Sequence, residues 1–181
     1  SRGLGDVYKR QKKEIKYYLN SREMFLDCRE RISVTGFTDI QRAAMFYVLV
    51  KTGFGASLRT FGCNKKRLNT DNFADIEARL DGVVIENKDF EDLIKVYDRE
   101  KALFYCDPPY HKTERHYTVK FTEDDHERLC RVLHQIKGRF VLSYNDDKYV
   151  RDLYKDYNIQ AVTRNNSLSS GDFKEVIITN F

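Results

Sequence analysis

The residues best suited to chemistry in this sequence are Asp107-Pro108-Pro109-Tyr110, which directly follow an apolar run. The Asp107 carboxylate and the Pro108 carbonyl are two hydrogen-bond acceptors, and the Tyr110 ring offers a flat face for stacking. Together they suit a planar group with an exocyclic NH2, because each acceptor can take one of its two hydrogens. Accepting both hydrogens draws the nitrogen toward a pyramidal geometry and frees its lone pair, so no covalent intermediate is required.

The apolar run before these residues predicts the element that must position them. Four apolar or aromatic residues over Leu103–Cys106 favour a fully buried strand, and the proline pair ends it, because proline supplies no N–H to a ladder. Asp107 is therefore expected at the carboxyl end of a strand. Ligands of open α/β sheets bind outside the carboxyl ends of the strands, which makes this end the expected site.

Apolar periodicity predicts alternating strands and helices in the second half of the chain. Strands are expected over 83–87, 103–106, 139–144, 159–163 and 175–179, with helices starting near Asp89, Thr122 and Asp147. This alternation favours an α/β fold with a Rossmann-like sheet.

The first half of the chain has helical patterns instead. One or two helices are expected between 12 and 31, with a break near Asn20-Ser21, and others from Thr38, where Gln41 completes a capping box, to Gly53 and over 71–79. Residues 1–11 show no apolar period and receive no functional weight. The loop 52–67 is glycine-rich and basic, a composition that suits contact with DNA as well as a solvated surface loop. Two regions are thus predicted, a helical region over 12–81 and an α/β region over 82–181.

Length and composition set wider bounds. The chain has 181 residues, 41% of them hydrophobic and 13% aromatic, which is enough for a real core in one domain or in one domain plus a small insert. A net charge of +4 is compatible with nucleic acid but does not argue for it. No run approaches the roughly 20 apolar residues needed to span a bilayer, and the four cysteines show no paired spacing. We therefore expect a reduced, cytoplasmic protein without a membrane partner.

With its flanking segments, the motif resembles the Dam-type (D12 class) DNA adenine-N6 methyltransferases. The resemblance runs from about Phe37 to the C-terminus and includes, in matching order, the segments 38–44, 51–59, 85–90, 121–126 and 140–146. It implies a site-specific enzyme that transfers a methyl group from S-adenosylmethionine to adenine N6, with a helical target-recognition (DNA-binding) region over 12–81 and the C-terminal part of the catalytic domain over 82–181. It also implies that the last strand of the sheet is antiparallel. Its substrate would be double-stranded DNA with the target adenine flipped out of the stack. In a restriction-modification system, a restriction endonuclease would accompany it.

The resemblance also implies roles for individual residues. The catalytic residues would be Asp107, Pro108, Pro109 and Tyr110, while Asp89, Phe90 and Asp107 would border the cofactor. DNA contacts would come from basic residues, namely Arg59, Lys65, Lys66, Arg67, Lys112 and Arg115.

Two features limit these assignments. Asp89 also suits a helix N-cap and Phe90 a core residue. Dam-like enzymes typically carry Asn-Gly in the recognition loop, where this chain has Gly55-Ala56, so the recognised DNA sequence is left open.

His126, Cys130 and His134 recur four residues apart on one expected helix. No metal site is expected there, because three side chains spread over two turns do not converge on one tetrahedral ion.

Two parts of the family's pattern are not found in this sequence. These are the glycine-rich Phe-x-Gly-x-Gly turn and the acidic residue that hold the methionine and ribose of the cofactor. The chain resembles the C-terminal two thirds of such an enzyme, so a missing N-terminal segment of its own protein is expected to pair beside the motif strand. Without it, we expect an inactive chain that binds S-adenosylmethionine weakly or not at all. Two alternatives remain, a truncated non-catalytic DNA-binding remnant and an amino methyltransferase that acts on RNA or protein.

Overall fold

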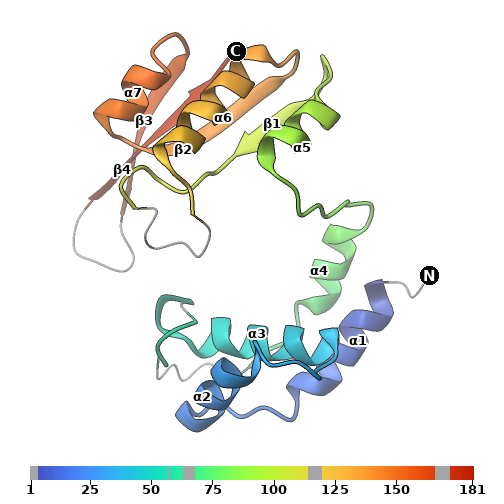
Figure 1. Ribbon diagram of the computed structural model, residues 1–181. Helices are drawn as coiled ribbons and strands as arrows, with labels where there is room; N and C mark the ends of the chain where they lie inside the picture. Colours follow the sequence, from blue (N-terminus) through green and yellow to red (C-terminus); the bar gives the residue numbers. More distant parts are fainter. Residues whose placement is uncertain (1–3, 57, 63–67, 114–119, 166–171) are drawn as a thin grey trace. The chain divides into compact units, whose positions relative to one another are not determined.

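The structure, a computed structural model, describes residues 4–56, 58–62, 68–113, 120–165 and 172–181. The chain forms two compact units, Ser1–Ile85 and Glu86–Phe181. Figure 1 shows helices in the first unit and a sheet with helices in the second. The α/β character predicted for the second half of the chain is confirmed by this mixed sheet.

The first unit is built around its longest helix, α3. A capping box starts this helix, as the sequence predicts: the Thr38 hydroxyl accepts the Gln41 amide, and the Gln41 side chain accepts the Thr38 amide at 3.0 Å. Helices α1 and α2 pack against α3. The helices are α1 (Leu4–Ile15), α2 (Arg22–Arg31), α3 (Asp39–Thr52) and α4 (Phe73–Leu80), with a 3-10 turn η1 (Phe54–Ala56) after α3.

Helix α1 begins earlier than the sequence pattern indicates. It starts at Leu4, within the segment for which no apolar period was expected, and Tyr8 and Ile15, seven residues apart on one side of an otherwise charged helix, make its contacts. The Tyr8 ring lies edge-on to Phe73 of α4, with centroids 6.0 Å apart, and Ile15 is buried. The break expected near residue 20 is confirmed, since Ser21 caps the N-terminus of α2.

The second unit contains a four-stranded sheet in the order β1-β2-β4-β3. Strands β1 and β2 are parallel, whereas β4 is antiparallel to both β2 and β3. The antiparallel last strand was implied by the family resemblance and is confirmed. The elements are β1 (Leu103–Cys106), β2 (Arg139–Asn145), β3 (Asn158–Asn165), β4 (Asp172–Thr179), α5 (Phe90–Tyr97), α6 (Glu123–Gln135) and α7 (Lys148–Leu153).

Alternate residues of the two inner strands form the core of this unit. Leu142 and Tyr144 of β2 and Ile178 of β4 have no accessible surface. They belong to one cluster with Ile94 of α5, Leu129 of α6 and Val150 of α7. All three helices therefore cover the same face of the sheet (Figure 1).

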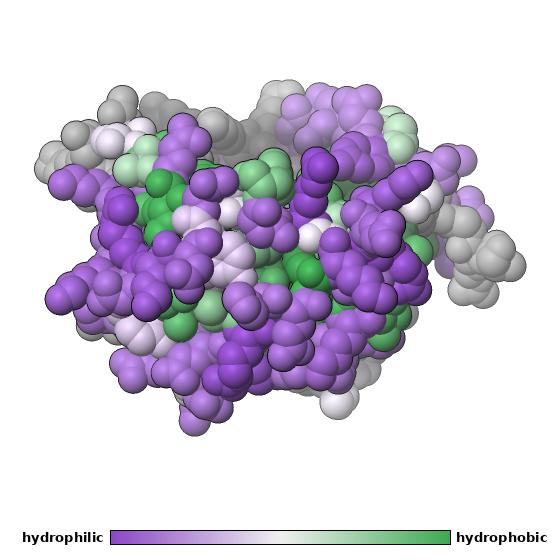
Figure 2. All heavy atoms as spheres, turned by 90° about the horizontal axis from the view of Figure 1, so that it is seen from above, coloured by the Kyte–Doolittle hydropathy of each residue, from purple (hydrophilic) through white to green (hydrophobic). Residues whose placement is uncertain are grey.

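Two expectations about strands were wrong. Strand β1 was expected to be fully buried, yet Leu103 is 63% and Tyr105 68% exposed, because these alternate side chains point to the face of the sheet that α5, α6 and α7 do not cover, whereas Phe104 and Cys106 pack against the core on the other face. A strand was expected over 83–87, but these residues form no ladder and the side chains of Val84 and Ile85 are exposed. Figure 2 shows one face of the molecule, on which apolar surface reaches solvent between hydrophilic side chains.

A tight junction between α5 and α6 fixes where β1 and β2 begin. The Asp98 carboxylate at the end of α5 accepts the amides of Lys137 at 2.9 Å and Gly138 at 3.0 Å. A Cβ on Gly138 would lie 2.7 Å from the Ala102 carbonyl oxygen, so the backbone approach requires glycine. The Arg139 amide then donates to that carbonyl at 2.8 Å, and the ladder starts with Leu103 beside Arg139. The first residues of the two strands are therefore paired in register.

Candidate active site

The residues after β1 lie at the carboxyl end of the sheet, as predicted. Asp107 is exposed, and with Pro108 it lines an apolar hollow of about 350 Å³. Phe90 and Phe121 contribute aromatic rings to the lining, and their centroids lie 5.9 Å apart. This volume is within the range of roughly 300 to 1,000 Å³ that small-molecule sites occupy. The geometry combines hydrogen-bond acceptors with aromatic surface in one hollow.

Tyr110 is half-buried and is not part of that lining. Its hydroxyl donates to Glu175 Oε1 on β4 at 3.0 Å and lies 3.1 Å from Ser143 Oγ on β2. Burial, and to a lesser degree the Glu175 carboxylate, raises the pKa of Tyr110 to about 12. The phenol therefore stays protonated at neutral pH and acts as the donor in this bond.

A second set of contacts fixes the chain just after the motif. Nδ1 of the buried His111 lies 3.1 Å from Asp147 Oδ1. The His111 imidazole stacks on the Tyr149 ring, with centroids 4.4 Å apart. Asn145, the last residue of β2, donates to the His111 carbonyl at 3.2 Å. The motif is thus attached to the carboxyl end of the neighbouring strand.

Lys112 adds an ion pair to this attachment. It has a positive φ of 66°, and its ammonium lies 3.0 Å from Asp147 Oδ2. Burial of Asp147 raises the pKa of its carboxyl. Bonds from Lys112 and the Tyr149 amide, with the charges of Lys112 and His111, outweigh burial, so the net pKa is lowered. Asp147 is therefore ionised at neutral pH.

Asp89 has the geometry of a helix cap. Its carboxylate accepts a hydrogen bond from the Glu91 amide at 2.9 Å. It also accepts hydrogen bonds from both terminal nitrogens of Arg128, at 2.8 and 2.9 Å. The Arg128 bond is the main reason that the pKa of Asp89 is lowered. Arg128 also lies over the Phe90 ring, 4.1 Å from its centroid. The N-cap interpretation of Asp89 is confirmed, and Phe90, unlike Asp89, lines the hollow.

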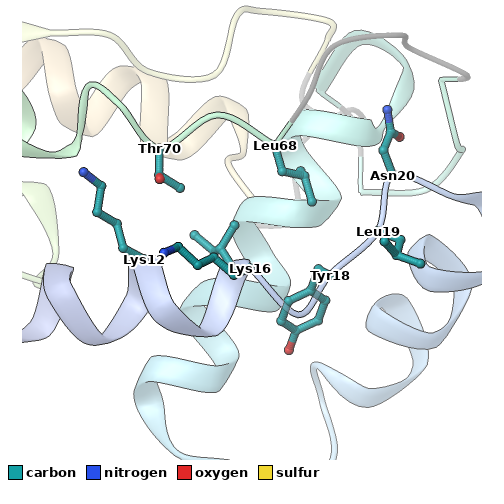
Figure 3. A pocket seen from close by; sticks show the side chains of 8 residues that line it. Lys12, Lys16, Tyr18, Leu19, Asn20, Leu68 and Thr70 are labelled. Atoms are coloured by element: carbon teal, nitrogen blue, oxygen red, sulfur yellow. The ribbon is translucent and has the colours of Figure 1, made fainter.

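The first unit has a separate basic hollow of about 520 Å³. Figure 3 shows Lys12 projecting from α1 toward Thr70, and Lys16, in the turn just after the helix, lines the same hollow. Within the part of the chain that the structure describes, neither lysine forms an ion pair. Two ammonium groups beside a hydroxyl suit an anion such as a phosphate.

Residues 4–168 match the family model of the D12 class N6 adenine-specific DNA methyltransferases. The chain belongs to this family. The match begins in α1, well before Phe37, where the sequence motifs become recognisable. In the comparison with curated proteins, no sequence matches the chain.

Only some of the DNA contacts expected from the family resemblance lie among the described residues. Arg59 is exposed on the loop after α3, and its carbonyl accepts the Arg29 guanidinium at 2.8 Å. Lys112 is exposed and paired with Asp147, which leaves its role toward DNA untested. The remaining four, Lys65, Lys66, Arg67 and Arg115, lie outside the described residues.

The regularly spaced residues of α6 in this D12 methyltransferase have separate partners. His126 Nδ1 lies 2.5 Å from the Tyr144 hydroxyl, and His134 Nδ1 lies 2.9 Å from the Tyr157 hydroxyl. The Cys130 thiol donates to the Leu153 carbonyl. Among the described residues, no group of histidine, cysteine and acidic side chains is arranged to hold a metal, and no helix is long and apolar enough to cross a membrane.

Sequence reasoning missed Ser143, Glu175, Asn145 and Arg128. The bonds that involve them join residues far apart in the chain, such as Tyr110 and Glu175, which are 65 positions apart. The available signal was a charged residue at the start of the apolar strand segment Glu175–Ile178. That signal indicates a polar role but does not identify the partner.

Proposed function

We propose that the complete protein transfers a methyl group from S-adenosylmethionine to adenine N6 in double-stranded DNA. The observation that carries this proposal is the exposed Asp107 carboxylate beside Pro108, at the carboxyl end of β1 and at the rim of an aromatic hollow. Membership of the D12 family supports the adenine-N6 specificity.

The hollow suits S-adenosylmethionine by the chemistry of its lining. Phe90 and Phe121 offer rings on which an adenine can pack, and the Asp107 carboxylate suits the positive charge of a sulfonium. When bound, the cofactor supplies an electrophilic methyl group. Asp89 would border it from the start of α5, where Arg128 already fixes the carboxylate.

The motif residues act on the target base in this proposal. Asp107 and the Pro108 carbonyl accept the two hydrogens of the adenine amino group, and Tyr110 stacks on the flipped ring. Pro109 keeps the turn rigid. Most of the rate acceleration comes from holding the nitrogen in line for direct attack, because the residues only need to position groups that are already reactive.

We infer further that another segment of the same protein pairs with the open edge of β1. Leu103 and Tyr105 are exposed on this strand, and Val84 and Ile85 are exposed in a segment that reads as a strand. An added strand would pair with this edge and occupy the part of the hollow that Leu103–Cys106 line, leaving the end beside Asp107 for the cofactor within a completed Rossmann-like sheet. The 181-residue chain alone is therefore expected to be inactive.

Calorimetric titration of S-adenosylmethionine tests this inference. We expect the 181-residue chain to bind at least about 100-fold more weakly than the complete gene product, a difference of about 2.7 kcal/mol. Equal, tight binding by both proteins would contradict it.

The basic residues of the first unit would contact DNA phosphates. To the expected set of Arg59, Lys65, Lys66 and Arg67 we add Lys12 and Lys16, which line one hollow (Figure 3). Lys112 and Arg115, near the motif, would meet DNA beside the flipped base. Phosphate contacts predict binding that weakens steeply as salt is raised.

Methylome sequencing of cells that express the complete gene tests the proposed function. The expected result is N6-methyladenine at one defined sequence, with loss of cleavage by restriction enzymes that are blocked there. Salt-sensitive DNA binding without methylation would instead indicate a non-catalytic DNA-binding protein. Methyl transfer to RNA or protein only would identify a different amino methyltransferase.

A further inference from the structure

The hydroxyl of the motif tyrosine is held by two strands of the sheet. Glu175 accepts from it at 3.0 Å, and Ser143 lies 3.1 Å away. Tyr110 itself belongs to the irregular segment after β1. A ring on a connecting segment is thereby fixed to a rigid part of the fold.

Glu175 is an unusual group to find at this position. Its side chain is almost fully buried, with 7% of the residue exposed, although burial of a carboxylate is costly unless hydrogen bonds compensate it. It lies on β4, which has ladder partners on both sides: Asn145 of β2 and Val162 of β3 stand opposite Glu175. The carboxylate therefore has little freedom to move.

The fixed position of Glu175 matters chiefly for the orientation of the Tyr110 ring. A tyrosine ring that stacks on a flipped base must present its face at a fixed angle, and two χ angles determine that angle. A bond at the far end of the ring restricts both. The neutral phenol, with its raised pKa, keeps the proton that this bond requires.

We propose that Glu175 is a positioning residue for the methyl transfer: it holds the Tyr110 ring in the orientation in which the ring stacks on the target adenine. The inference rests on the proposed function, because it concerns the same motif. Glu175 contacts Tyr110 and acts through it, whereas Asp107 contacts the reacting amino group. Ser143 supports the hydroxyl from β2.

Variants of the complete protein test this role under single-turnover conditions. Glu175→Ala should lower the rate of methyl transfer about tenfold or more, since hydrogen bonds to charged groups are worth about that factor. Glu175→Gln should stay within about threefold of the unaltered protein, because its amide oxygen can still accept the phenolic proton. KM for DNA should change little in both variants, since the phosphate contacts remain.

A double substitution makes the test specific. Tyr110→Phe keeps the ring but removes the hydroxyl, so it should lower the rate as Glu175→Ala does. The combined Tyr110→Phe/Glu175→Ala protein should be no slower than the slower single variant, because both changes break one interaction. Asp152→Asn, an exposed acid on α7, is the matched control and should leave the rate unchanged.

The outcomes separate this inference from the proposed function. Absence of adenine methylation by the unaltered complete protein would contradict the proposed function itself. If that protein is active, an unchanged rate in Tyr110→Phe, equal loss in Glu175→Gln and Glu175→Ala, or multiplicative losses in the double variant would each overturn the positioning role. If Glu175→Ala does not fold, Tyr110→Phe and Glu175→Gln still decide the question, with thermal unfolding as the check on folding.

Discussion

Strands β1 and β2 are neighbours with similar sequences and very different surroundings. Both are short apolar runs that end in a polar segment, and both were predicted to be strands. Leu142 points to the helix-covered face of β2 and has no accessible surface, whereas Leu103 points to the other face of β1 and is 63% exposed. Strand β2 lies between β1 and β4, while β1 is the last strand of the described sheet.

The difference shows that composition predicts a strand but not its neighbours. A run of apolar residues is consistent with burial on both sides only if the fold supplies a strand or helix on each side. The motif Asp107–Tyr110 follows β1, which has a neighbouring strand on one side only among the described residues. The chemistry proposed for this motif is therefore expected beside the open edge of the sheet.

The largest expected difference between the two strands is catalytic. Asp107→Ala after β1 should lower methyl transfer by the complete protein on the order of 10³-fold or more, because it removes an acceptor for the reacting amino group. Asp146→Ala after β2 should cost only a few-fold. Asp146 is paired with Arg151, at 2.5 Å from Nε, and is not part of the motif. Radiolabelled methyl transfer to DNA measures both, and equal losses would refute the assignment to β1.

The next difference concerns stability. Leu142→Ala should lower the free energy of unfolding by about 3 kcal/mol, because it leaves a cavity in the core of the sheet. Leu103→Ala, on the exposed face of β1, should cost less than about 1 kcal/mol. Urea denaturation of the 181-residue chain at low concentration provides the comparison. A similar cost for both would mean that this face of β1 is covered in solution.

The smallest difference concerns the helices that lead into the two strands. Arg128 of α6 joins Asp89 at the start of α5, with N–O distances of 2.8 and 2.9 Å, and also reaches Asp125 at 2.9 Å. Arg128→Gln should lower the free energy of unfolding by at most about 1 kcal/mol, because the cluster is partly exposed to solvent and salt.

The pH dependence of the Arg128→Gln effect follows from the carboxylates that Arg128 contacts, Asp89 and Asp125. The pKa values of Asp89 and Asp125 are lowered in the folded protein. The stability that these two carboxylates contribute is therefore fully present above their unfolded pKa of about 4. It is lost as the pH falls through their pKa values in the folded protein. The difference in Tm between Arg128→Gln and the unaltered chain should be constant from about pH 8 to 5 and shrink below about 4. Arg131→Gln, whose partner Glu127 lies 3.6 Å away at the surface, should show almost no difference.

Local sequence signals predicted the parts of this fold that depend on local contacts. The capping boxes at Thr38 and Thr122 and the end of β1 before Pro108 were all predicted, because each depends on residues within a few positions. The placement of Asp107 at the carboxyl end of a strand followed from the same reasoning. The motif was therefore located correctly before its surroundings were known.

Long-range contacts could not be predicted in this way. The anchor of Tyr110 comes from strands 33 and 65 positions further along the chain, and nothing near the tyrosine indicates it. The expected strand over 83–87 failed for the same reason, since a strand requires a partner that local sequence does not supply. The expected roles of Asp89 and Phe90 toward a cofactor, and of the basic residues toward DNA, remain predictions.

The junction at Gly138 has a consequence for how this protein can vary. It fixes the first pair of the β1–β2 ladder, so an insertion or deletion of one residue between Arg99 and Ala102 would shift the end of β1 by about 3.3 Å relative to β2. Such a shift exceeds the tolerance of the bond between Tyr110 and Glu175 and would also turn alternate side chains to the opposite face. We therefore expect natural variants to preserve the length of this turn even where its residues differ.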